Sequence, residues 1–488
     1  MSTVSRAAEL VRHADRFFIG GEWVAPATNA TIDVIDSYTE RRFLTVAAAD
    51  AADMARAVGA ARTAFDEGPW PRMSPAERAS YVGKLGARLA SRADDLAELW
   101  TREVGVLHSV SRFASGSVGG VWSAYASLAE SFPFEEEVRP AAGGRGLLVR
   151  EPVGVVGAII PWNGPLTIIS HKVAPALLAG CTVVLKCSPE APGEGYLFAE
   201  VAEEIGLPPG VVNVVSADRE VSELLVSDPR VDKITFTGST AAGRRIASLC
   251  GERIARYTLE LGGKSAALIL EDADVATAAA SLVQAECLAT GQVCSSLTRV
   301  IVTEDRHDEV VDALAAAFSQ VRVGDPFDPA TQMGPLATQR QRDRVEGYIA
   351  KGLDEGATLA TGGRRPTDLD HGWFIEPTVF ANVDNRSTIA QEEVFGPVLC
   401  VISAVDEPDA IRIANDTIYG LNSNVFTPDS ERARRVAVRL RSGTVGHNGS
   451  RPDFGIAFGG FKQSGVGREG GREGFLSFLE TKTVILER

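Results

Sequence analysis

Short apolar runs alternate with helical segments between residues 153 and 252, and this alternation constrains the fold more than any other feature of the chain. Four runs have the length and composition of buried strands: VGVVGAII (153–160), TVVLK (182–186), VVNVVS (211–216) and KITF (233–236). Each run precedes a segment of helical pattern, and strands that are connected through helices pair in parallel. We therefore expect an α/β fold built on a doubly wound parallel sheet.

The same alternation resumes after residue 260, with SAALIL, a helix over 275–288 and the strand RVIVT. This predicts a second α/β layer. Upstream, residues 50–105 and about 112–130 have helical periodicity, and FIGGEWV (18–24) is typical of a short hairpin. A chain of 488 residues is too long for a single hydrophobic core, so two or three domains are expected.

Two further segments are expected to lie apart from these layers. Residues 135–151 predict a projecting hairpin, and KTVIL (482–486) predicts a final strand at the C-terminus. Both would expose strand edges, which usually require a partner.

Composition excludes several classes of protein. The net charge of −15, without any basic run, argues against nucleic-acid binding. The N-terminus has no apolar segment of the signal-peptide kind, and the most apolar stretch, 153–170, is interrupted by prolines, so no membrane span is expected. The six cysteines form no CxxC pair. This favours free thiols in a reducing cytoplasm and no metal site.

Three stretches are candidates for binding a nucleotide. The literal G-x-G-x-x-G at Gly465, Gly467 and Gly470 does not follow a strand, so it predicts only a glycine-rich turn. FTGSTAAG (236–243) follows a strand and opens a helix, where Ser239 could cap the helix and meet a phosphate, or be an ordinary cap. Lys186 ends another strand, where it could bind a ligand or be a surface lysine.

Three other stretches carry candidate catalytic groups. Asn163, in PWNGP, could direct an amide donor at an oxyanion or be a turn asparagine. Glu260, in LELGGKS, is expected in an apolar turn, where desolvation would raise its pKa and make it a general base. Cys294, in GQVCS, lies in a loop between a helix and a strand and could be a nucleophile or a small core residue. Cys287 is expected to pack on the helix.

The order and spacing of these stretches resemble the aldehyde dehydrogenase superfamily, over nearly the whole chain. Besides PWNGP, FTGS, LELGGKS and GQVCS, the resemblance rests on QEEVFGPV and FGGFKQSG, and on the 34 positions between Glu260 and Cys294. It implies that Cys294 attacks an aldehyde, that Asn163 and the Cys294 N–H hold the oxyanion, and that Glu260 activates the water that hydrolyses the thioester. It implies NAD as the cofactor, with NADP as the alternative.

The resemblance also implies the surroundings of this chemistry. The residues expected to bind the cofactor are Ile160, Trp162, Lys186, Glu190, Gly238, Ser239, Gly243, Leu261, Glu393 and Phe395. Those expected at the substrate tunnel are Gly164, His171, Phe454 and Phe458, with Asn448 nearby. Gly164 and His171 stand where relatives often carry aromatic residues, which predicts a roomier, slightly polar mouth. Pro189 replaces a glutamate that often contacts the ribose, so the choice between NAD and NADP stays open.

The domains implied are a Rossmann-like cofactor domain (1–130 and 150–257), an α/β catalytic domain (258–465) and a small β bridging domain (131–149 and 466–488) that pairs subunits into a homodimer or homotetramer. Two alternatives remain. The acyl group could pass to CoA instead of water, although Glu260 favours hydrolysis, or the chain could be a silent family member that only binds. The aldehyde itself is not identified.

Overall fold

The first of two large sheets confirms the predicted doubly wound α/β architecture. The computed structural model describes residues 9–449, 453 and 455–486. Four neighbouring strands of this sheet, β10, β7, β8 and β9, run parallel, as their connecting helices require. In spatial order the sheet comprises β19 (Gly465–Val466), β11 (Arg256–Glu260), β10 (Lys233–Thr237), β7 (Val155–Ile159), β8 (Thr182–Cys187), β9 (Val212–Ser216), β1 (Phe17–Ile19) and β2 (Glu22–Val24).

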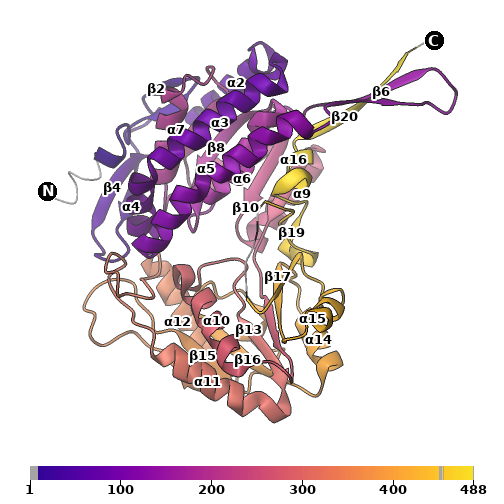
Figure 1. Cartoon of the computed structure of the whole chain (residues 1–488). Helices are drawn as coiled ribbons and strands as arrows, with labels where there is room; N and C mark the ends of the chain where they lie inside the picture. Colours follow the sequence, from indigo (N-terminus) through magenta and orange to yellow (C-terminus); the bar gives the residue numbers. More distant parts are fainter. Residues whose placement is uncertain (1–8, 450–452, 454, 487–488) are drawn as a thin grey trace.

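A second large sheet forms the other half of the molecule, in the lower part of Figure 1. It is parallel except for its first strand, β14, which is antiparallel to β15. The predicted second α/β layer is therefore present. In order, its strands are β14 (Thr358–Thr361), β15 (Thr378–Ala381), β16 (Val398–Ala404), β13 (Arg299–Thr303), β12 (Ala266–Ile269), β17 (Asn422–Phe426) and β18 (Thr444–His447).

A three-stranded arm projects from the body and carries the C-terminus (Figure 1). It consists of β5 (Glu135–Val138), β6 (Arg145–Pro152) and β20 (Leu479–Leu486). The expected hairpin and the expected last strand are both present, and the last strand has one edge paired and one edge open. It pairs with β6 of its own chain over its full length, from Leu479 opposite Pro152 to Leu486 opposite Arg145. The open edges of the arm are β5 and the outer side of β20.

Helices cover both sheets. The predicted helices are confirmed, although α6 begins at Pro165 instead of about residue 168, since proline is favoured at the first helical position. A two-stranded sheet, β3 (Thr31–Ile35) and β4 (Arg42–Ala47), lies beside them. The helices are α2 (Ala51–Asp66), α3 (Pro75–Ser91), α4 (Ala93–Val104), α5 (His108–Ser131), α6 (Pro165–Ala179), α7 (Gly193–Glu204), α8 (Arg219–Ser227), α9 (Thr240–Glu252), α10 (Val275–Cys287), α11 (His307–Ser319), α12 (Gln339–Asp354), α13 (Thr388–Gln391), α14 (Glu407–Asn415), α15 (Ser430–Ala437) and α16 (Gly471–Leu476).

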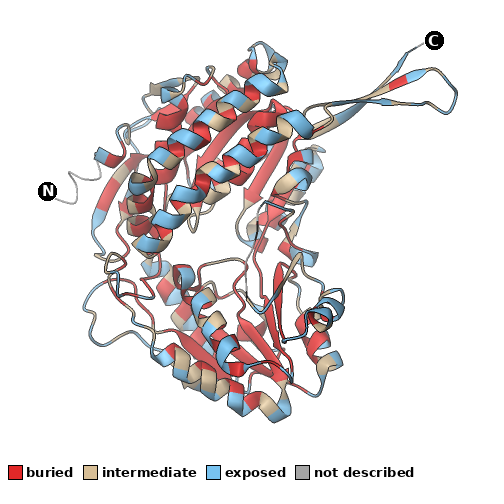
Figure 2. Cartoon of the chain, in the orientation of Figure 1, coloured by how far each residue is buried: buried red, intermediate tan, exposed pale blue. Residues whose placement is uncertain are grey.

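Burial is concentrated in the strands of the two large sheets and in the helix faces against them (Figure 2). Each large sheet has apolar clusters on both faces, which is why its strands read as continuous apolar runs in the sequence. The arm, in contrast, is largely exposed or half-buried. Among the described residues, no helix has the length and apolar character needed to cross a membrane.

Candidate active site

The loop that carries Cys294 follows α10 and has an unusual backbone. Ala289, Thr290 and Gly291 are all left-handed, with φ of 48°, 57° and 70°. Such angles are costly for a β-branched residue and persist only where the surroundings enforce them. Here the Thr290 hydroxyl bonds to the carbonyls of Gly334 (2.9 Å) and Pro335 (3.1 Å), and Gln292 Oε1 accepts from Ala337 N at 2.9 Å. The loop is therefore held from several sides.

Cys294 is the only partly exposed cysteine of the six; the other five are buried. Cys287 is among the buried ones, as expected for a packing residue. Desolvation raises the pKa of the Cys294 thiol to about 12, and the neighbouring carboxyls of Glu393 and Glu260 add to the shift. In this environment the group is a thiol at neutral pH. It needs a base or a nearby positive charge to become a nucleophile.

Asn163 lies directly against this loop. Its Nδ2 donates to the carbonyl oxygen of Gln292 at 2.9 Å, and its own carbonyl accepts from Trp100 Nε1 at 3.0 Å. The Asn163 amide is thus fixed against the facing loop, at Gln292, which lies two positions before Cys294. This hydrogen bond joins PWNGP and GQVCS, two segments that are far apart in the sequence.

Glu260 is the last residue of β11, and not part of a turn as predicted. The strand continues to this point because Gly238 N donates to Glu260 O at 3.0 Å. Both carboxyl oxygens are buried and have no hydrogen-bond partner among the described residues. Gly459 makes room for them, since a Cβ there would lie 2.5 Å from Glu260 Oε1. Burial raises the pKa of Glu260 well above its ordinary value, and Glu469 raises it further.

The sequence analysis did not predict the buried ion pair that lies beside Glu260. Lys172, on α6, pairs with Glu469 and also donates to Thr235 Oγ1 at 3.1 Å. Lys172 acts against the rise in the pKa of Glu260. One signal could have revealed the pair: Lys172 is a charged residue inside a helix whose other residues are nearly all apolar. Buried charges of this kind are rare unless they are paired.

A buried serine that the sequence reading also passed over connects two of the motifs. Ser464, in FGGFKQSG, donates to Gly262 O at 2.7 Å and accepts from Gly420 N at 2.9 Å. Its carbonyl accepts from Leu261 N at 2.9 Å. The glycine-rich segment predicted as a turn at 465–470 therefore anchors the LELGGKS loop, and its first two residues form β19 against β11.

The carboxyl ends of β7 and β8 bring together several residues expected at a cofactor. Lys186 is buried, which lowers its pKa, and its amine has no hydrogen-bond or ion-pair partner among the described residues. Its carbonyl accepts from Ile160 N at 3.2 Å. Lys186 is therefore not the surface lysine that the local sequence allowed. Nearby, Glu190 accepts hydrogen bonds from Ser188 and from Arg340 Nη2, the latter at 2.6 Å. These bonds lower its pKa although burial alone would raise it.

The turn from β10 into α9 is compact. Ser239 is the N-cap of α9, accepting from Ala242 N at 3.3 Å. At Gly243 a Cβ would lie 2.6 Å from the side chain of Leu261, so helix and loop approach closely. Gly238 likewise lacks room for a Cβ, which would meet the ring of Phe236 at 2.5 Å. The strand, turn and helix N-terminus have the geometry of an anion-binding site.

Glu393 and Phe395 approach from the second sheet. Glu393 Oε1 accepts from Gly263 N at 3.2 Å, and Gly262 lacks a side chain where Glu393 packs. Burial raises the pKa of Glu393 to about 7. Phe395, with φ of 61°, meets Trp162 edge-on at 5.4 Å between ring centroids. These contacts bring residues far apart in the chain together beside the LELGGKS loop and Trp162.

A cavity of about 430 Å³ lies beside the segment that carries Asn163. One face of α5, with Val118, Val121 and Leu128, forms much of its wall, and His171 of α6 contributes to it. Gly164 lines a smaller adjoining pocket that shares Ala114 and Thr167 with the larger one and has no free space for a water molecule.

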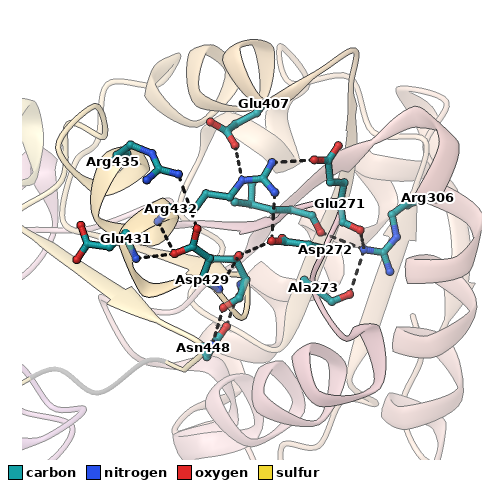
Figure 3. Close-up of polar contacts among 12 residues, drawn as sticks. Glu271, Asp272, Ala273, Arg306, Glu407, Asp429, Glu431, Arg432, Arg435 and Asn448 are labelled. Atoms are coloured by element: carbon teal, nitrogen blue, oxygen red, sulfur yellow. Dashed lines mark hydrogen bonds and ion pairs between the residues drawn. The ribbon is translucent and has the colours of Figure 1, made fainter.

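Two residues expected at or near the tunnel line neither cavity, and a third lies outside the described residues. Phe458 is buried, pairs through its backbone with Glu469, and lines neither cavity. Phe454 lies outside the described residues. Asn448, which was expected near the tunnel, turns away: it donates to Thr427 O at 2.8 Å and accepts from Thr427 N at 3.0 Å. It joins a polar cluster around Arg432, which pairs with Glu271, Asp272 and Glu407 (Figure 3).

Comparison with known proteins agrees with this arrangement. The model of the aldehyde dehydrogenase family matches residues 23–484. The chain belongs to the aldehyde dehydrogenase family. It is 45% identical to geranial dehydrogenase of Castellaniella defragrans over 96% of this chain and 98% of that protein.

Two solved aldehyde dehydrogenases have the same fold. That of Mycobacterium tuberculosis, solved with NAD+, is 46% identical with a TM-score of 0.94, covering 97% of this chain and 98% of that one. A variant of aldehyde dehydrogenase C of Pseudomonas syringae, solved with NAD+ and octanal, is 40% identical with a TM-score of 0.94, covering 97% of both chains. The family supports the expected reaction class, NAD-dependent oxidation of an aldehyde.

The residues present fit a dinucleotide. Lys186 is buried at the carboxyl end of β8, Gly238 has no room for a Cβ in the turn before α9, and the first N–H groups of α9 have no carbonyl partner within the helix. Among the described residues, no group of three or more histidine, cysteine or acidic side chains could hold a metal ion.

Proposed function

We propose that this aldehyde dehydrogenase oxidises bulky, largely apolar aldehydes to carboxylic acids with NAD+, and that Cys294 is its nucleophile. The observation that carries the assignment is the hydrogen bond from Asn163 to Gln292, because it places an amide donor beside the only partly exposed thiol. Lys186, the turn at Gly238 and Ser239, and Glu393 hold the dinucleotide, with Trp162 and Phe395 beside its ring. Bound NAD+ supplies the hydride acceptor.

The chain's own groups perform the remaining steps. Cys294 gives its proton to solvent water and its Sγ bonds to the carbonyl carbon, while the C=O π electrons move to the oxygen. The Asn163 amide and the Cys294 N–H hold that oxyanion. When the oxyanion collapses, the carbonyl carbon loses hydride and the acyl group remains on Sγ as a thioester. Glu260 takes a proton from water, whose oxygen bonds to the acyl carbon and releases the acid and the thiol.

Glu260 suits the role of base because of its surroundings. Its carboxyl is buried with both oxygens unpaired among the described residues, and its raised pKa makes the carboxylate a stronger base than an ordinary glutamate. The Lys172–Glu469 pair lies beside it. Glu469 raises the pKa of Glu260 and Lys172 lowers it. The presence of Glu260 favours water over CoA as the acyl acceptor.

The size and lining of the larger cavity support the substrate class. The aliphatic side chains of Val118, Val121 and Leu128 on α5 form an apolar wall of this cavity. A volume of about 430 Å³ is in the range of sites for small organic ligands. Geranial and octanal, named for two relatives, are apolar aldehydes of this kind.

The test is absorbance at 340 nm with purified protein, NAD+ or NADP+, and a panel of short, long-chain, branched and aromatic aldehydes. Cys294→Ala is the control. We expect NADH from long or branched aldehydes with the natural chain and none with the variant. A signal that requires added CoA would replace hydrolysis by acyl transfer to CoA. No turnover by the reduced protein, together with NAD+ binding in a titration, would identify a silent family member.

The choice between NAD+ and NADP+ depends on the pocket near Lys186. Pro189 offers no carboxylate, and the carboxylate of Glu190 is neutralised by Arg340. Repulsion of a 2′-phosphate is therefore weak, so we propose NAD+ as the main cofactor with measurable use of NADP+. A ratio of kcat/KM values above about 10³ for NAD+ over NADP+, equivalent to about 4 kcal/mol, would contradict weak discrimination.

The division into domains and the assembly are also part of this proposal. The first sheet with its helices would be the cofactor domain, the second sheet the catalytic domain, and the arm a bridging domain. The arm has open edges at β5 and β20, and Ile485 on β20 is 69% exposed. Pairing of arms between subunits would cover both, giving a homodimer or homotetramer. Light scattering of the protein and of Ile485→Lys tests this.

The six free cysteines favour a reducing cytoplasm.

A further inference from the structure

Four residues from two helices form a hydrogen-bond network behind Asn163, and the sequence analysis assigned no role to any of them. Trp100 and Glu103 lie on α4, and Gly193 and Glu194 begin α7. Trp100 Nε1 donates to Asn163 O at 3.0 Å, and Leu166 N donates to Glu194 Oε2 at 2.8 Å. Gly193 N donates to Glu103 Oε1 at 3.0 Å, which returns the network to α4.

The N-terminus of α6 depends on this network. Its N-cap is Gly164, which has no side chain to accept a hydrogen bond, and Pro165 has no N–H. Leu166 N is therefore the first N–H of the helix that needs an acceptor, and Glu194 provides one from another helix. Since Asn163 directly precedes this cap, the position of α6 sets the position of the amide.

The two carboxyl groups are suited to hold such a contact inside the protein. Glu103 and Glu194 are each 1% exposed, and desolvation raises the pKa of both, that of Glu194 to about 8. Glu194 is therefore mostly neutral near pH 7 and avoids the cost of a buried charge. Gly193 is required between them, since a Cβ there would lie 2.7 Å from Glu103 Oε1 and 2.8 Å from Leu99 Cδ2.

We propose that Glu194, supported by Glu103 and Trp100, is a positioning residue that holds the first turn of α6 and thereby the oxyanion-binding amide of Asn163. Glu194 does not contact the reacting atoms. This inference deepens the proposed function, because its kinetic consequence depends on the role given to Asn163.

The test begins with hydrogen–deuterium exchange of the whole protein, which does not depend on activity. In Glu194→Ala, the amides of residues 163–168 should exchange at least about tenfold faster, equivalent to one lost capping bond, while exchange in β8 is unchanged. Glu194→Gln keeps an acceptor oxygen and should restore slow exchange. Unchanged exchange in Glu194→Ala would overturn the proposal.

The second experiment is kinetic, a double-mutant cycle with Asn163→Ala. Glu194→Ala alone should lower kcat about tenfold or more, with the KM for NAD+ nearly unchanged, and Glu194→Gln should recover most of it. Once Asn163→Ala is present, Glu194→Ala should have little further effect, because its route to the chemistry is gone. Equal effects in both backgrounds would show a general structural role and refute the positioning route. If the natural chain oxidises no aldehyde, the proposed function fails, while the exchange experiment still decides whether Glu194 holds α6.

Discussion

The two loops that meet at the active site are held in different ways. The Cys294 loop is fixed through its backbone: three left-handed residues, close approach of Gly291 to Gly396, and hydrogen bonds to main-chain carbonyls. The Asn163 loop has no positive φ among residues 160–166, and is held by side chains of α4 and α7, two of them buried acids. The Cys294 loop thus depends on its backbone conformation. The Asn163 loop depends on a hydrogen-bond network that contains titratable carboxyl groups.

The largest difference should appear in catalysis. Cys294→Ala removes the atom that bonds to the substrate and should lower kcat by more than about 10⁴-fold. Asn163→Ala removes one oxyanion donor and should cost about 10² to 10³-fold. NADH formation measures both, and NAD+ titration should give similar affinities for the two variants. Equal losses would mean that the loops do not have separate roles.

Stability should separate the loops through two glycines. In Gly291→Ala the new Cβ would overlap the backbone of Gly396, at a φ of 70°, so we expect a loss of at least about 3 kcal/mol in unfolding free energy. Gly164→Ala is the matched change in the other loop, where the nearest atom is Trp100 Cζ2 at 3.9 Å. It should change stability by less than about 1 kcal/mol. Urea unfolding measures both; a tolerated Gly291→Ala would contradict the strained-loop account.

The buried acid of the Asn163 side should make stability depend on pH. Glu194 has a pKa of about 8 when folded and 4.5 ordinarily, so only the unfolded chain releases its proton between these values. Stability from this group is complete below about pH 4.5 and is lost as pH rises to about 8, by up to about 1.4 kcal/mol per pH unit. Glu194→Gln should flatten the profile. Glu252→Gln, at an exposed position, is the control and should leave it unchanged.

The lack of a side chain at Gly164 should appear in substrate selectivity. Gly164→Phe adds a ring beside Trp100, in the narrow pocket next to the larger cavity, and should lower kcat/KM for branched aldehydes about tenfold while sparing acetaldehyde. Steady-state kinetics with both substrates measure this ratio. An unchanged preference would remove Gly164 as a determinant of substrate size.

The smallest expected effect concerns the Cys294 thiol. Desolvation is the largest cause of the raised pKa of the Cys294 thiol, and the charge of Glu393 is the second. Glu393→Gln should therefore lower that pKa by about one unit or less. Alkylation by iodoacetamide at pH 9 should then be severalfold faster than in the natural chain. Cys294→Ala identifies background labelling of other thiols. A slower reaction would show that Glu393 does not act on the thiol by charge.

Much of this could be predicted from sequence because local pattern is sufficient for it. Continuous apolar runs such as 153–160 predict strands buried on both faces, and Ser239 after KITF predicts a helix start. The motif residues Asn163, Glu260 and Cys294 could be selected because reactive side chains stood among glycines and prolines. The support of these residues could not be predicted. Lys172 is conspicuous as a charge in an apolar helix, but its partner Glu469 and the carboxyl of Glu194 look like ordinary charges until the fold buries them.

By itself, the sequence determined the α/β class, the order of the elements and the residue types available for thiol chemistry, because periodicity and turn chemistry act over short distances. Only the tertiary structure decided which distant groups meet. It joined Asn163 to the Cys294 loop, buried Lys186 and Glu260, and paired β20 with β6 of the same chain. Burial and the resulting pKa shifts depend on what packs around a group, and that is a property of the folded chain as a whole.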